Sequence, residues 1–104
     1  MSNIIFRDFL LGFIKIHILH HAEKEPIFGM EFQDELKRHG YNISFGTLYP
    51  IFHKLEKEGY LKTVKENVNG KIRKYYTITK TGKSVLKQAK IKANELVAEL
   101  NEVD

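Results

Sequence analysis

The hydrophobic positions of the chain first recur at helical spacing. A segment from about Ser2 or Asn3 to His21 carries isoleucine, leucine and phenylalanine on almost every side, and the pair Glu25-Pro26 interrupts it. A helix that is apolar most of the way round is buried on several sides. The pattern therefore predicts a helix that packs into its own domain. A second subunit is a candidate for burying part of its surface.

A shorter helical segment is expected over about residues 29–39. Its apolar positions Phe32, Leu36 and Met30 are expected to face inward. Gly40 follows the last periodic position, where a glycine commonly ends a helix. Only a short connector then separates this segment from the next one.

A third helical segment begins at Gly46 or Thr47 and runs to Glu58. Either Ser44 or Thr47 can cap it, and a cap at Thr47 would place Pro50 in the first turn, where the missing N–H has no intrahelical partner. Its inward stripe comprises Leu48, Ile51, Phe52 and Leu55. Two short helices joined by a tight connection are typical of a helix-turn-helix.

A β-hairpin follows Gly59, which ends the third helix. Asn69-Gly70 stands between two β-prone runs and is the usual signal of a two-residue type I′ turn. This turn fixes the predicted register, in which the opposed pairs are Leu61 with Ile78, Glu66 with Arg73, and Lys65 with Lys74.

A long final helix is expected from about Lys80 to near Glu102, with Thr79 as its cap. The predicted fold class is mainly α with a small β-hairpin, arranged as a winged helix-turn-helix plus a long C-terminal dimerisation helix. We expect residues 1–79 to form the DNA-binding domain and residues 80–104 to form the dimerisation helix.

Apolar residues of the final helix recur at alternating spacings of three and four, as at heptad a and d positions. They are Leu86, Ala89, Ala93, Leu96, Leu100 and Val103. A chain of 104 residues cannot easily cover both this stripe and the apolar flanks of the first helix. We therefore predict a homodimer in which the stripe packs on the first helix of a second subunit. Its partners there would be Phe6, Phe9, Leu10 and Phe13. The alternative is a stripe that folds back on its own domain.

The charge of the chain is divided unevenly. Residues 1–36 carry a net charge of −3, residues 37–90 carry +10, and residues 91–104 carry −3. A basic block between two acidic ends is the distribution expected of a protein that binds nucleic acid. A basic surface without a partner is the alternative.

The outward arc of the third helix holds no acidic side chain. It holds Tyr49, Pro50, His53, Lys54 and Lys57, whereas Glu56 and Glu58 lie on its borders. A face exposed only to solvent would mix both signs, so this one is suited to duplex DNA, with Lys and Arg on phosphates. The predicted DNA-binding residues on this helix and on the hairpin are Ser44, Thr47, Tyr49, His53, Lys54, Lys57, Asn69, Gly70, Lys71, Arg73 and Lys74.

Other chemistries have weaker support. The chain has no cysteine, which excludes disulfides, thiol catalysis and sulfur-ligated metals and fits a reducing cytoplasm. No catalytic arrangement stands out, and no cofactor is expected. His17 and His21 could share a metal, but the sequence fixes no third ligand, so no metal site is assigned. A protein-interaction module that docks its basic face on an acidic partner is the alternative function.

The apolar N-terminal segment does not predict a membrane protein. Arg7, Asp8 and Lys15 interrupt it, and it contains no small-residue cleavage site. No uncharged run approaches the length of about 18 residues that a membrane span requires. We expect no membrane association and a cytoplasmic protein.

Three stretches of the chain resemble the PadR-like family of bacterial transcriptional regulators. They are GMEFQDELKRHG, SFGTLYPIFHKLEKEGYL and NGKIRKYYTITKTGK, and the likeness spans roughly residues 26–84. The run Gly46-Thr47-Leu48-Tyr49-Pro50, followed by Leu55-Glu56 and Gly59, is fairly specific, and Lys74-Tyr75-Tyr76 leading into Thr79 and Gly82 adds weight.

The resemblance implies a homodimeric winged-helix protein, usually a repressor, that binds a palindromic operator through the wing and the helix at residues 46–58. It also implies a small aromatic effector held near the dimer interface. Two departures are visible. Phe28-Gly29-Met30 stands where the family often has Tyr-Gly-Tyr, and without tryptophan the chain cannot build a ligand slot floored by indoles.

Overall fold

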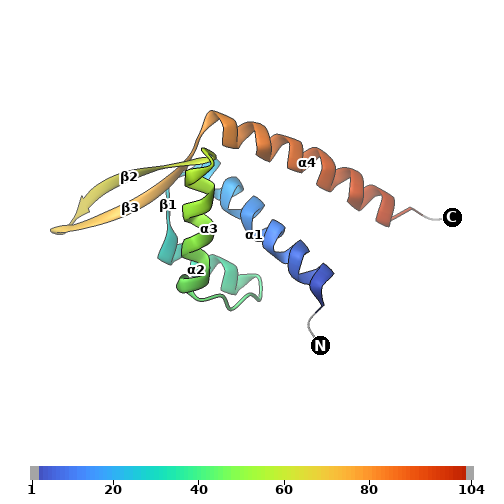
Figure 1. The fold of residues 1–104 in the computed structure, drawn as a ribbon, viewed down its shortest axis with the longest axis horizontal. Coiled ribbons are helices and arrows are strands. Elements are labelled where there is room, and N and C mark those ends of the chain that lie inside the picture. Colours follow the sequence, from blue (N-terminus) through green and yellow to red (C-terminus); the bar gives the residue numbers. More distant parts are fainter. Residues whose placement is uncertain (1–2, 103–104) are drawn as a thin grey trace.

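The computed structural model describes residues 3–102 and extends over 60 × 35 × 22 Å. Its elements follow in the order α1 (Ile4–Lys24), β1 (Ile27–Phe28), α2 (Gly29–Arg38), α3 (Phe45–Lys57), β2 (Leu61–Val68), β3 (Lys71–Ile78) and α4 (Lys80–Leu100). The hairpin of β2 and β3, which is the wing of the winged helix, projects from one side of the helical body. The helix α4 extends from the other side (Figure 1). The predicted winged helix-turn-helix with a long C-terminal helix is confirmed.

The core lies where the inner half of α1, the pair α2 and α3, and the base of the sheet meet. Its fully buried side chains come from all four helices and from β2: Ile14, Ile18, Leu19, Leu36, Leu48, Phe52, Leu61 and Leu86. Phe32 is also buried, as predicted, and its ring meets that of Phe52 edge to face. Met30 is exposed, so the prediction that it faces inward is wrong. It precedes Phe32 by two positions, and this spacing places the two on different sides of a helix.

The helix α1 is longer than predicted at its C-terminal end. Asn3 caps it, since its Oδ1 accepts a hydrogen bond of 3.0 Å from the Phe6 N–H. The helix ends at Lys24, directly before the predicted break at Glu25-Pro26. The alternative start at Ser2 lies outside the described residues.

The helix-turn-helix is bounded by local signals. Gly40, at φ +86°, follows the last turn of α2, and the Tyr41 N–H donates back to the Leu36 carbonyl. Ser44 caps α3 by accepting a hydrogen bond of 3.3 Å from the Thr47 N–H. The alternative cap at Thr47 is therefore wrong, and Pro50 lies inside the helix rather than in its first turn.

The sheet has three strands in the order β1-β3-β2, all antiparallel. The predicted hairpin register is confirmed, with Leu61 opposite Ile78 and the two positive φ angles of a type I′ turn, 54° at Asn69 and 82° at Gly70. The third strand was not predicted, because β1 has only two residues and so shows no periodicity. It pairs Phe28 with Tyr75 and thereby joins the base of the wing to the start of α2.

The first turns of α4 pack against the core of the domain, whereas the rest of this helix is exposed to solvent. Thr79 caps it as predicted, and Leu86 is buried in the core of its own chain. The prediction that Leu86 contacts a second subunit is therefore wrong: the first two turns of α4 complete the winged-helix core. From Ile91 onward the helix is exposed, and the predicted stripe position Val103 lies outside the described residues. Among residues 3–102, no helix is both long enough and apolar enough to cross a membrane.

Candidate nucleic-acid interface

The acid-free arc of α3 faces away from the core. Tyr49, Pro50, His53, Lys54 and Lys57 are all exposed, whereas Leu48, Phe52 and Leu55 on the opposite arc are buried. The burial pattern thus matches the helical period that the sequence predicted. Within residues 3–102, the ammonium groups of Lys54 and Lys57 have no ion-pair partner.

The N-terminal turn of α3 presents hydroxyl and N–H groups to solvent. Ser44 Oγ lies 3.2 Å from Thr47 Oγ1, and both residues are exposed. Unpaired N–H groups and the positive end of the helix dipole at this position suit a phosphate oxygen. Further along, the rings of Tyr49 and His53 stack nearly parallel, 6.1 Å apart at 12°. Both side chains lie on the outward face.

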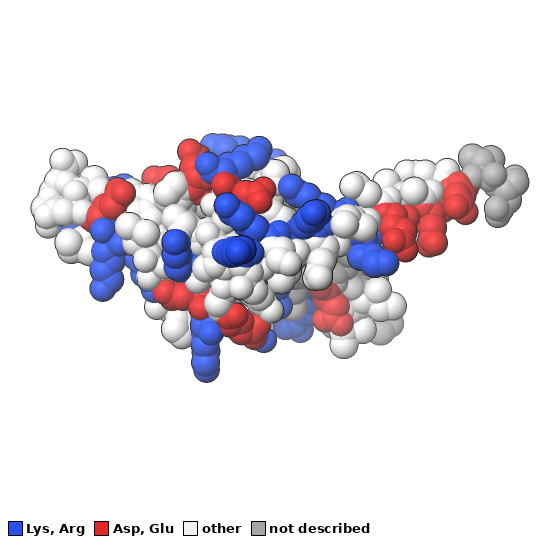
Figure 2. All heavy atoms as spheres, turned by 90° about the horizontal axis from the view of Figure 1, so that it is seen from above, with Lys and Arg blue, Asp and Glu red and all other residues white. Residues whose placement is uncertain are grey.

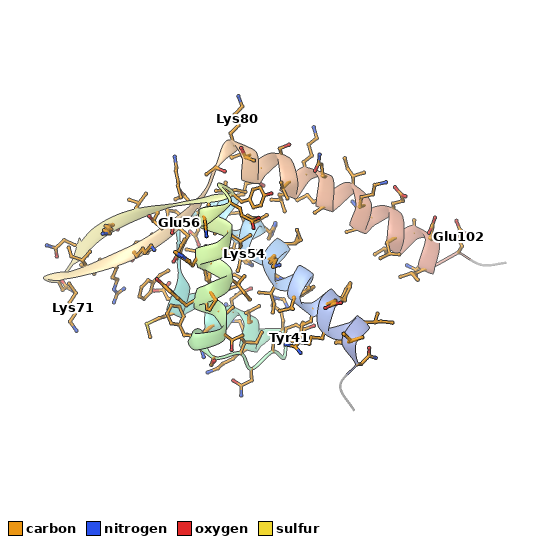
Figure 3. All side chains as sticks on the ribbon, viewed as in Figure 1. Tyr41, Lys54, Glu56, Lys71, Lys80 and Glu102 are labelled. Carbon is orange, nitrogen blue, oxygen red and sulfur yellow. The ribbon has the colours of Figure 1, made fainter. Side chains whose placement is uncertain are left out.

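Lys54 lies on the far border of that face. It lines a groove that is bounded by α1, α4 and the same side of α3, together with Ile51 and Glu58. In Figure 3 its side chain is drawn on the α1 side of α3, away from the wing. His53 is therefore more central on the outward arc than Lys54.

The tip of the wing carries the predicted turn residues at its outer end. Asn69, Gly70 and Lys71 are exposed, and Figure 3 shows Lys71 at the far end of the hairpin. The turn is closed by the Gly70 N–H, which donates a hydrogen bond of 3.0 Å to Asn67 Oδ1. An exposed lysine at this tip can neutralise a phosphate beside the one that α3 contacts.

Two basic residues of the wing are already engaged within the chain. The guanidinium of Arg73 lies 5.0 Å from the centre of the Phe28 ring, and the Lys74 Nζ lies 3.4 Å from Glu56 Oε1 on α3. Lys74 was predicted to bind DNA, but it shares its face of the strand with Tyr76 and points toward α3 rather than outward. Both side chains are half-buried.

The carboxylate of Glu56 joins the wing to α3. It accepts hydrogen bonds from Lys74 at Oε1 and from Thr63 Oγ1, 2.9 Å away, at Oε2. Desolvation acts to lower the pKa of Lys74, but the neighbouring Tyr76 and Glu56 raise it above its ordinary value, so the ammonium is charged. Burial raises the pKa of Tyr76, which stays a neutral phenol. The acid at the border of the basic face is thus neutralised from the wing.

The last turns of α4 carry mainly acidic side chains, whereas basic and acidic side chains lie among one another over the centre of the molecule (Figure 2). Figure 2 also shows Lys and Arg along the wing. Glu102 lies at the end of α4 in Figure 3. The electrostatic attraction for an anionic partner is therefore concentrated on the winged-helix domain.

The predicted dimer residues fall into three groups. Leu86 is buried, while Leu10, Phe13 and Ala89 are half-buried. The remaining predicted residues are exposed on the outer halves of the two helices: Phe6, Phe9, Ala93, Leu96 and Leu100. Between these helices runs the groove described above, with a volume of about 840 Å³. Phe9 is 61% exposed and Leu100 is 74% exposed, an unusual exposure for such large apolar groups.

Sequence reasoning missed the tie between α3 and the wing. Glu56 and Thr63 were not assigned to the site, although the helical wheel had already placed Glu56 on a border of the face. The alternation of β3, which puts Lys74 on the same face as the buried Tyr76, was the signal that could have found the pair.

The family model described as "Transcriptional regulator PadR-like family" matches residues 18–88 of the chain. The transcriptional regulator Rv3488 of Mycobacterium tuberculosis is 38% identical over 94 residues, which cover 90% of this chain and 88% of that protein.

Solved structures show the same arrangement. A PadR-like transcription factor from Bacteroides fragilis superposes with a TM-score of 0.80 at 26% identity, covering 95% of this chain and 97% of the other. A PadR family transcriptional regulator from Eggerthella lenta has a TM-score of 0.74 at 30% identity, covering 96% of this chain and 95% of the other. The likeness therefore includes α4 as well as the winged helix.

Proposed function

Because the chain belongs to the PadR-like family of transcriptional regulators, we propose that it is a repressor that binds a near-palindromic operator as a homodimer. The proposed DNA-binding surface is made of the outward arc of α3 and the tip of the wing. A regulator of this kind acts in the cytoplasm, where bacterial DNA is accessible.

The observation that carries the proposal is the exposed, acid-free arc of α3. Its lysines Lys54 and Lys57 have no ion-pair partner among the described residues, and the one half-buried acid beside them, Glu56, is neutralised by Lys74. A surface that only needed solubility would carry both signs on this arc. The arc is instead suited to enter a major groove while the wing follows the backbone.

The contacts divide into two kinds. Lys57, Lys71 and the N-terminal turn of α3 supply phosphate contacts, which fix register and dominate affinity. His53 and Tyr49, whose rings stack, supply contacts to base edges. Lys74 makes no DNA contact in this proposal. Its ammonium instead holds the wing to α3 by its hydrogen bond to Glu56.

The exposed apolar halves of α1 and α4 support the dimer. In the proposed assembly the outer half of α1 from one subunit enters the groove between α1 and α4 of the other, and Phe6 and Phe9 contact Leu96 and Leu100. A two-fold axis through this seam would present two copies of α3 to one face of DNA, about 34–36 Å apart.

The groove also supports the proposed effector site, in the part that the partner's α1 would leave open. It is lined by apolar and aromatic side chains, among them Phe9, Phe13 and Ile16, and so suits a small planar aromatic compound. A compound bound at the seam would change the spacing of the two α3 helices and release the operator. Thermal unfolding against a panel of aromatic compounds identifies such a ligand by a rise in Tm.

Selection from a random duplex library tests the DNA proposal. The expected result is one enriched inverted repeat with half-sites one helical turn apart. If about six to ten phosphates are neutralised per dimer, log K should fall with log salt at a slope of roughly −5 to −9. A protein that enriches no sequence but binds an acidic protein surface would support the alternative interaction module instead.

A further inference from the structure

Two helices, α1 and α2, bring histidine and glutamate side chains together outside the proposed DNA-binding surface. His17 and His21 lie one turn apart on α1, and Glu35 lies one turn before His39, the residue that caps α2. Residues at i and i+4 share one face of a helix. Each helix therefore offers a pair of metal-ligating side chains to the other.

The donor atoms of three of these residues converge. One donor atom each from His17, Glu35 and His39 lies within 4.8 Å of the other two. His39 Nε2 is 3.4 Å from Glu35 Oε1, and the rings of His17 and His39 are 4.7 Å apart. His21 Nε2 lies 3.5 Å from the same carboxylate oxygen.

The carboxylate of Glu35 is held in a useful orientation. Arg38 Nη1 donates a hydrogen bond of 2.7 Å to Oε2, which leaves Oε1 facing the imidazoles. A carboxylate with one oxygen fixed by a neighbour and the other oxygen directed at the site is a common arrangement around bound metals. Arg38 itself is mostly exposed and occupies no donor position.

We propose that His17, Glu35 and His39 bind one divalent transition metal of the zinc class, with water in the fourth position. Two imidazoles and one carboxylate suit Zn²⁺ and its neighbours, whereas Mg²⁺ and Ca²⁺ prefer oxygen ligands alone. Tetrahedral zinc needs donor atoms roughly 3.4 Å apart, given bonds of about 2.1 Å. Donor atoms up to 4.8 Å apart thus need to close by up to about 1.4 Å, which the partial exposure of the side chains allows.

The proposed metal would join two parts of the chain that have different tasks. His17 lies on the helix whose outer half is exposed, and Glu35 and His39 lie at the end of α2, immediately before the connector to α3. The site uses none of the residues assigned to DNA, so its test is independent of the proposed function.

Zinc titration of the untagged, full-length protein tests the site. After dialysis against a chelator, the protein is titrated with ZnCl₂ by calorimetry, and thermal unfolding is followed with ZnCl₂ or MgCl₂ present. We expect one zinc per chain and a higher Tm with zinc but not with magnesium. Glu35→Gln and His17→Ala should each weaken zinc binding by at least about 10-fold. His20→Ala, on the same helix, is the matched control and should bind as the wild type does.

Cobalt gives a second readout that does not depend on unfolding. Bound Co²⁺ in a tetrahedral site absorbs strongly in the visible region, and this signal should be lost in Glu35→Gln and retained in His20→Ala. The proposal is overturned if the wild type binds no zinc. It is equally overturned if Glu35→Gln binds zinc as tightly as the wild type, which would indicate scattered surface histidines.

Discussion

Lys74 on the wing and Glu56 on α3 form an ion pair, with Nζ and Oε1 3.4 Å apart. The pair lies at the back of the proposed DNA surface, and Thr63 donates to the second oxygen of the same carboxylate. The wing therefore has a defined angle to α3 before any DNA is bound. At partial exposure such a pair contributes only about 0–1 kcal/mol to stability, so its effect is on geometry.

This arrangement predicts different roles for two lysines of the same hairpin. Lys71→Ala should reduce the magnitude of the salt slope of DNA binding by about 0.9 per lost phosphate contact, because Lys71 is exposed at the tip. Lys74→Ala should change that slope by less, since its charge is already paired with Glu56. Fluorescence anisotropy at several salt concentrations measures both. Equal losses from the two variants would show that Lys74 leaves Glu56 and binds phosphate directly.

His53 is predicted to determine sequence preference rather than overall affinity. His53→Ala should alter the enriched operator at one position of each half-site, with a change in discrimination of about 1–3 kcal/mol. Lys57→Ala is the control on the same face and should weaken all duplexes similarly. Library selection with the two variants gives the comparison, and an unchanged preference for His53→Ala would remove it from the base-contacting set.

The outer half of α4 is predicted to hold the dimer together. Leu96→Glu should yield monomers at micromolar concentration, because it places a charge in the apolar seam. Asn94→Glu, roughly 160° from Leu96 around the same helix, should leave the dimer intact. Sedimentation velocity distinguishes the species. A wild type that sediments only as a monomer would refute the proposed dimer interface.

Gly82 is predicted to be intolerant of any side chain. A Cβ built there would lie 2.2 Å from the Tyr60 carbonyl oxygen and 2.7 Å from Ile78 Cγ1, so α4 would have to move away from the base of the wing. Gly82→Ala should lower the free energy of unfolding by about 1–3 kcal/mol, as overpacking does. Gly46→Ala, whose added Cβ meets nothing closer than 3.7 Å, is the matched control. Urea unfolding measures both, and equal stabilities would contradict the close approach.

Local signals were sufficient for most of the fold. Asn69-Gly70 fixed the hairpin register, and Gly40 and Gly59 marked helix ends, because each of these depends on a few adjacent residues. The strand β1 could not be predicted, since a two-residue strand is defined only by its partner β3. Leu86 was misassigned because its heptad spacing is the same whether the partner is its own core or a second subunit.

The candidate site was predictable only in part, because some of its contacts join residues that are far apart in the sequence. The outward arc of α3 follows from one helical period, whereas the pairing of Lys74 with Glu56 joins residues that only the fold brings together. The cluster around Glu35 is a similar case. The spacing of His17 and His21 was visible in the sequence, but the partners on α2 became known only from the packing of two helices.

Thr79 has a mechanical consequence for the whole molecule. Its hydroxyl donates to the Gly59 carbonyl at 2.6 Å and accepts from the Gly82 N–H at 3.0 Å, so one side chain fastens the end of α3 to the beginning of α4. With 21 residues, α4 is a rod about 30 Å long. A tilt of roughly 10° about this joint would sweep the distant tip of the rod through about 5 Å. No flexible linker separates Thr79 from α4. A displacement of the tip of α4 would therefore be transmitted directly to the C-terminal end of α3.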